Sequence, residues 1–246
     1  MDNFKVNERL ERIRRENAEF EKDSPYNFCD RWCARCAHEK QARCKLYLDE
    51  FERKTTCIAY GRPIDDFQVT SAIFEKQFED LENLDSPYPP EFDDEFDDDF
   101  DDEEDYDDIE EDEPEFQEGL DNHPLQLTAE QYCQRAHNFL KNVFYGDQDV
   151  IIKFNYDFET IAWYHTLLAA KMHRALYGLH ESNEGDEFGL CDAVAQLTIC
   201  QKSIKESIKV LRRLKGYFPE HCSAITELLA LLNNISSRII HIEENI

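Results

Sequence analysis

The acidic tract at residues 91–118 most limits what this chain of 246 residues can fold into. It contains 20 Asp and Glu residues and no Lys or Arg, and it supplies most of the formal net charge of −28. Carboxylates at this density repel one another, and such a segment cannot bury enough apolar surface to offset the entropy lost on ordering. We therefore expect a disordered linker that divides the chain into two parts.

Aromatic residues interrupt the acidic tract at a regular interval. Phe92, Phe96 and Phe100 recur at every fourth position, so they would share one face if a partner induced a helix there. Three interpretations stay open: a solubilising spacer, a segment that engages a basic protein partner, or a mimic of nucleic-acid phosphate that binds a basic nucleic-acid-binding protein. Because 55 acidic residues face 27 basic ones, the composition argues against direct binding of nucleic acid.

No targeting or membrane segment is recognisable in the sequence. Residues 1–20 are charged throughout and lack the apolar core of a signal peptide, and the longest clean apolar run is Leu228–Leu232. We therefore expect a cytoplasmic protein without membrane association. In that compartment thiols stay reduced, so crowded cysteines indicate ligation or redox chemistry rather than disulfides.

Four of the nine cysteines lie within sixteen residues: Cys29, Cys33, Cys36 and Cys44. Four soft ligands suit either a structural zinc ion or a [4Fe–4S] cluster, and the spacing leaves the choice open. On one continuous helix, Cys29 and Cys36 would be about 10 Å apart, which is long for a single zinc ion. The segment must therefore turn, or a larger cluster must bridge the sulfurs. Cys57 or His38 could replace one ligand, and partly buried thiols without a metal are the third interpretation.

Nearby basic residues would offset the negative charge of a thiolate-ligated centre. They are Arg31, Arg35, Lys40, Arg43 and Lys45.

The stretch Phe28-Cys-Asp-Arg-Trp-Cys-Ala-Arg-Cys36, followed by Arg43-Cys-Lys-Leu-Tyr47, resembles the amino-terminal signature of a group of uncharacterised bacterial proteins. In that group, a carboxy-terminal helical region holds a Trp-Tyr-His element followed by Lys and by Arg-Ala-Leu. The corresponding residues here would be Trp163-Tyr164-His165, Lys171 and Arg174-Ala175-Leu176. The resemblance implies no activity.

Helical periodicity dominates the remaining sequence and predicts an all-α fold. Short connections between long helices favour an antiparallel four-helix bundle at the carboxy-terminal end. Caps and glycines place the expected bundle helices at Thr128–Gly146, Tyr156–Tyr177, Leu190–Leu214 and Pro219–Glu243. Val150–Ile152 is the one stretch that could form a short strand.

The expected organisation has five regions. They are an amphipathic helix (1–25), a cysteine-rich metal-binding module (26–62), a helix with a proline-rich break (63–90), the acidic linker (91–118) and the helical bundle (124–246).

His165 lies on an apolar helical stripe, which favours a buried histidine bonded to a neighbouring helix. The alternative is a polar pocket that His165 forms with Lys171 and Arg174. No glycine-rich phosphate loop, nucleophile–base pair or H-E-x-x-H motif is present, so the sequence does not favour an enzyme.

We therefore expect a non-catalytic, cytoplasmic metal-binding protein that acts through a protein partner, with a basic partner as one option. The alternatives are an iron–sulfur redox enzyme or electron carrier, and an acidic mimic.

Overall fold

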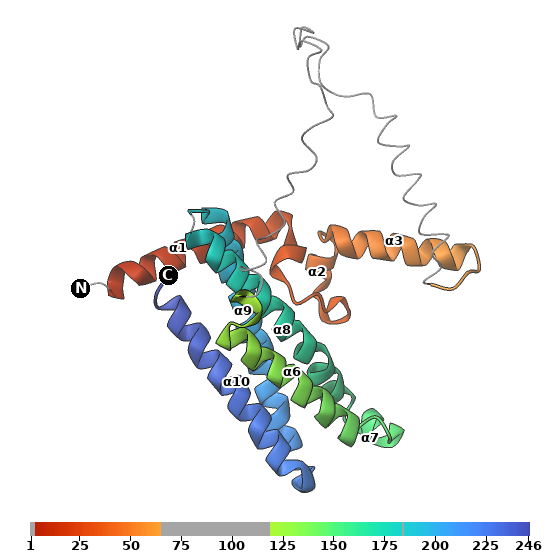
Figure 1. The fold of residues 1–246 in the computed structure, drawn as a ribbon. Coiled ribbons are helices and arrows are strands. Elements are labelled where there is room, and N and C mark those ends of the chain that lie inside the picture. Colours follow the sequence, from red (N-terminus) through yellow and green to blue (C-terminus); the bar gives the residue numbers. More distant parts are fainter. Residues whose placement is uncertain (1–2, 65–118, 184) are drawn as a thin grey trace, which may run out of the picture. The chain divides into compact units, whose positions relative to one another are not determined.

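The computed structural model describes residues 3–64, 119–183 and 185–246 (Figure 1). Every regular element within these ranges is helical and none is a strand, which confirms the all-α prediction. The predicted acidic linker and most of the region 63–90 lie outside the described residues. Among the described helices, none has the length and apolar character needed to cross a membrane.

The chain divides into two compact units. The first joins residues 1–36 to residues 114–246, and the second covers residues 37–113. In its described part, the second unit contains α2 (His38–Gln41) and α3 (Lys45–Ala59). Cys44 therefore belongs to the second unit, whereas the other three cysteines of the predicted cluster belong to the first.

Four long helices form the body of the first unit: α6 (Pro124–Val143), α8 (Asn155–Asn183), α9 (Glu187–Leu214) and α10 (Cys222–Glu243). Helices α6 and α9 each pack against both α8 and α10, and helices that follow one another run in opposite directions (Figure 1). Apolar side chains at helical spacing fill the interior between them. The largest that are fully buried include Tyr132, Phe144, Leu168, Met172, Leu197, Leu211, Ile225 and Leu228.

The amino-terminal helix α1 (Asn3–Asp23) packs along α9. Leu10 and Ile13 are buried against Leu190 and Val194, so these two apolar residues of the expected amphipathic helix face the bundle. The Asn17 amide adds a hydrogen bond to the carbonyl of Cys191 at 2.8 Å. The helix predicted at this end of the chain is thus present.

The start of α6 corrects the predicted capping box. The helix begins at Pro124, and the His123 ring accepts a hydrogen bond from the Leu125 backbone N–H at 3.2 Å. The Thr128 hydroxyl instead donates to the carbonyl of Pro124 at 2.6 Å from within the helix. Proline suits the first position of a helix better than the interior, because backbone N–H groups in the first turn have no partner within the helix and proline has no N–H.

Gly178 does not end α8, which continues to Asn183. A Cβ atom at Gly178 would lie 2.5 Å from the carbonyl oxygen of Gly189 on α9. The glycine therefore allows close helix packing instead of terminating a helix.

The possible strand at Val150–Ile152 is also wrong. These residues lie in the short helix α7 (Gln148–Lys153), where the Asp147 side chain accepts from the backbone N–H groups of Asp149 and Val150. This cap stabilises a helical start next to an otherwise strand-like run.

Candidate cysteine site on the helical bundle

The segment from Cys29 to Cys36 turns instead of forming one helix. Cys29 has extended backbone angles, Arg31 has a positive φ of 53°, and a single 3-10 turn spans Cys33–Arg35. Cys36 is extended again, with φ −74° and ψ 142°. On one straight helix, Cys29 and Cys36 would lie too far apart to share a zinc ion. The turn in the backbone removes this obstacle.

The sulfur of Cys29 has two hydrogen-bond contacts within this turn. The Arg31 backbone N–H donates to Cys29 Sγ at 3.4 Å, and the thiol lies 3.6 Å from the carbonyl oxygen of Tyr26. Arg31 has a left-handed backbone conformation, which is uncommon for a residue other than glycine. In this conformation its N–H points at the Cys29 sulfur. Such N–H···S bonds stabilise a negatively charged sulfur, because the donor dipole faces the charge.

Asp30 fixes the cysteine segment to the bundle. Its carboxylate accepts hydrogen bonds from Tyr164 Oη and Lys202 Nζ, both at 2.8 Å, and its backbone carbonyl accepts from Trp163 Nε1 at 2.9 Å. The residue is 9% exposed. Burial raises the pKa of Asp30, but the hydrogen bonds and the positive charge of Lys202 outweigh burial and lower the pKa overall.

Aromatic contacts extend this attachment. The Trp32 ring stacks on Trp163 at a centroid distance of 5.4 Å and meets the Tyr164 ring edge-on at 5.5 Å. The Arg35 guanidinium lies 3.5 Å from the Trp32 ring centroid and donates to Thr160 Oγ1 at 3.0 Å. The two sequence elements of the resemblance, one around Cys29–Cys36 and one around Trp163–Tyr164, are therefore in direct contact.

Lys171 is a buried cation on the same face of α8 as Tyr164, two helical turns further along. It is 7% exposed and, within the described residues, has no hydrogen bond or ion pair. Burial lowers its pKa, and the positive charges of Arg174 and Arg31 lower it further, whereas the charge of Cys29 acts in the opposite direction. Lys171 and Cys29 are thus close enough to interact electrostatically.

The neighbours of Lys171 do not neutralise it. Asp192 already accepts two hydrogen bonds from Arg174, both at 2.7 Å, and one from Gln196 at 2.8 Å. Burial raises the pKa of Cys200 to about 12 although Lys171 acts to lower it, so this thiol stays neutral. An ammonium without an acceptor is costly to bury, so this position suits an anionic partner.

His165 has a different environment from Lys171 and Arg174. Its Nδ1 lies 2.8 Å from the carbonyl oxygen of Ala162 and 3.0 Å from that of Ile161, both in its own helix, and not against a neighbouring helix as we expected. Burial lowers its pKa, and the adjacent His137 of α6 lowers it further. His165 therefore has different neighbours from Lys171 and Arg174, and the three side chains do not line one polar pocket.

The remaining candidate ligands belong to the second unit. Cys44 is buried at the N-terminal boundary of α3, Cys57 is fully buried within that helix, and the His38 ring lies 3.0 Å from the side-chain oxygen of Gln41. Across the described ranges, no three His, Cys, Asp or Glu side chains are grouped as metal ligands are.

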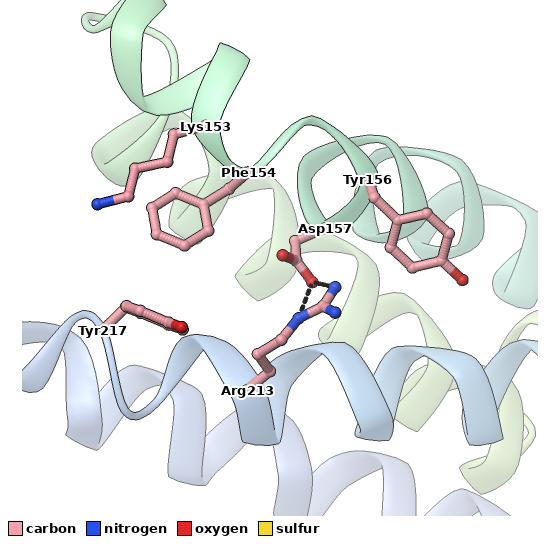
Figure 2. A pocket seen from close by; sticks show the side chains of 6 residues that line it. All are labelled: Lys153, Phe154, Tyr156, Asp157, Arg213 and Tyr217. Carbon is pink, nitrogen blue, oxygen red and sulfur yellow. Dashed lines mark hydrogen bonds and ion pairs between the residues drawn. The ribbon is translucent and has the colours of Figure 1, made fainter.

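An open pocket of about 320 Å³ lies where α8 begins and α9 ends (Figure 2). Asp157 and Arg213 point toward each other across it and form a hydrogen-bonded ion pair. A carboxylate in the first turn of one helix and a guanidinium in the last turn of another both complement the helix dipoles. This pair links the two helices, and Lys153 is the third charged residue that lines the pocket. Sequence analysis did not identify the pair.

Comparison of the chain with protein-family models, with curated proteins and with solved structures finds no match.

Proposed function

We propose that this protein is a non-catalytic, cytoplasmic metal-binding protein in which Cys29, Cys33, Cys36 and Cys44 hold a zinc ion or a [4Fe–4S] cluster. It acts through a protein partner, with the acidic tract as a candidate contact for a basic one. The observation that carries the proposal is the turn of the backbone between Cys29 and Cys36, which Asp30 holds on the bundle. A thiol-rich turn on a rigid support reduces the entropy lost when a metal orders its ligands.

Charge balance also supports the proposal. Thiolates that bind a metal leave a net negative centre, and each ligand loses its thiol proton to water as its sulfur binds the ion. Lys171 interacts electrostatically with Cys29, and the Arg31 backbone N–H already donates to the Cys29 sulfur. The turn is thus electrostatically suited to a sulfur that has lost its proton.

Metal analysis of the full chain purified without oxygen tests the proposal. We expect about one zinc per chain with no visible colour, or about four irons with brown colour and absorbance near 400 nm. The double variant Cys33→Ser/Cys36→Ser should lose the metal. The matched control is Cys133→Ser/Cys222→Ser, which changes two partly exposed thiols outside the segment and should keep the metal.

Circular dichroism of both variants separates loss of a site from loss of the fold. Retention of the metal by Cys33→Ser/Cys36→Ser would remove these residues as ligands. A wild-type chain that binds neither zinc nor iron would refute the metal-binding function itself.

A further inference from the structure

A groove of about 490 Å³ runs along the carboxy-terminal half of α9 and is bordered on one side by α10. Ile208, which is half-buried, contributes apolar surface to it, and Ile204, which also lines it, is 2% exposed and belongs to the bundle core. Three cations line it at helical spacing, namely Lys205, Lys209 and Arg212, and no carboxylate does. The groove therefore combines an apolar floor with a positively charged rim.

The cations of the groove differ from those that form ion pairs elsewhere on the bundle. Arg174 is paired with Asp192, and Arg213 with Asp157. Lys205 and Arg212 are exposed and have no ion pair or hydrogen bond in the described part of the chain. Lys209 has only a long contact to Glu206, at 3.8 Å. A chain with twice as many acidic as basic residues thus leaves these cations available.

The chemistry of the groove selects among occupants. A nucleic-acid backbone would satisfy the cations but would place no apolar group on the isoleucines. A purely apolar helix would cover the isoleucines but leave the cations without partners. A helix with one apolar face and acidic flanks satisfies both, because its apolar residues recur at the three- and four-residue spacing of helix-in-groove recognition.

We propose that this groove docks an acidic amphipathic helix of a protein partner, with apolar side chains against Ile208 and carboxylates beside Lys205 and Arg212. This surface is separate from the cysteine segment and does not depend on metal binding. Its partner is opposite in charge to the basic partner considered for the acidic tract.

Fluorescence anisotropy on the full chain tests the docking. The probe is a fluorescein-labelled peptide about five helical turns long, with leucine on one face and glutamate on its flanks. A scrambled peptide of the same composition lacks the apolar face and should bind about tenfold more weakly. The variant Lys205→Glu/Arg212→Glu should also weaken binding about tenfold, and salt should weaken binding to the wild type.

The matched control is Arg15→Glu/Lys141→Glu, which makes the same change in net charge at two exposed cations outside the groove. Its affinity should stay within about twofold of the wild type. Thermal unfolding of both variants checks that the fold is intact.

Several outcomes would overturn the proposal. They are no binding of the ordered peptide, equal binding of the scrambled peptide, or equal losses in the two double variants. Displacement of the probe by a single-stranded oligonucleotide, with tighter binding than the peptide, would instead indicate a nucleic-acid site. A synthetic peptide of residues 91–118 that binds more tightly than the probe would indicate that the groove takes an acidic segment of this chain or of a second copy.

Discussion

Lys171 is a buried ammonium that packing alone does not explain. Its neighbours are a carboxylate already engaged by Arg174, a neutral thiol and the sulfur of Cys29. Other charged residues with low exposure in the same unit have bonded partners, as Asp30 has with Lys202. The position is therefore costly unless an anion forms beside it, and a metal-bound thiolate is the anion that the proposed function supplies.

Lys171→Met should have opposite effects on the metal-free and metal-bound protein. Without metal, removing an uncompensated buried charge should raise the free energy of unfolding by about 1–2 kcal/mol. With metal, loss of the compensating charge should weaken binding by about tenfold to a hundredfold. Denaturant unfolding and competitive metal titration measure the two effects.

Lys141→Met is the control, since Lys141 is exposed on α6. It should change neither quantity by more than about 0.5 kcal/mol. If Lys171→Met binds the metal as tightly as the wild type, the electrostatic role of Lys171 is wrong even though the metal site stands.

His165 makes stability depend on pH. Its pKa is lowered in the folded chain, mainly by burial, so the unfolded chain takes up its proton at a higher pH. The stability it contributes is full above the unfolded pKa of about 6.5 and falls as the pH drops through and below that value. His165→Gln should therefore reduce the loss of melting temperature between pH 7.5 and pH 5.5. An unchanged pH slope would show that the ring does not stay neutral in the fold.

At the scale of helices, contacts between two helices determine why some residues are present, and local sequence signals do not reveal these contacts. Glycine usually favours a helix end, yet α8 passes through Gly178, where the backbone of α9 lies too close to leave room for a side chain. The partner in that contact is Gly189, eleven residues further on. The glycine at position 178 therefore reflects contact with a second helix and does not mark a helix end.

Gly178→Ala should lower the free energy of unfolding by about 2 kcal/mol, although alanine has the higher helix propensity by about 1 kcal/mol. The reason is that the new methyl group would meet a backbone carbonyl that cannot move independently of α9. Gly146→Ala serves as control, because no atom lies within 4 Å of its added Cβ. It should leave stability unchanged or raise it by up to about 1 kcal/mol. Thermal unfolding of the two variants compares them directly, and equal stabilities would contradict the close approach of α8 and α9.

At the scale of the whole molecule, the charge is unevenly distributed along the chain. Residues 91–118 hold 20 acidic groups, whereas the bundle carries exposed cations such as Lys205 and Arg212. Such an arrangement affects association with partners more than it affects the fold.

Replacing residues 91–118 by a Gly/Ser linker of equal length tests what the acidic tract does. Helical content and melting temperature should stay close to those of the full chain, because a tract of 20 like charges can bury little apolar surface. If the tract engages a basic partner, that partner should be lost from a pull-down. Retention of every partner would leave the tract as a spacer.

The fold class could be predicted from the sequence because helical periodicity is a local property. Apolar residues at three- and four-residue intervals located α1, α8, α9 and α10 to within a few residues at most of their ends. The start of α6 was placed too late, at Thr128, and α7 was not predicted as a helix, because proline, histidine and aspartate caps compete with equally plausible signals nearby.

The sequence by itself determined that this chain is helical, that four cysteines are crowded near its start, and that its charge is concentrated in one tract. Only the tertiary structure decided that Asp30 and Trp32 dock on Trp163 and Tyr164, that Lys171 is buried and within electrostatic reach of Cys29, and that His165 packs near His137. The physical reason is that periodicity and composition depend on neighbours in the chain, whereas burial and electrostatic partners depend on which helices meet. Residues more than a hundred positions apart can be joined by a hydrogen bond, and no local pattern encodes that pairing.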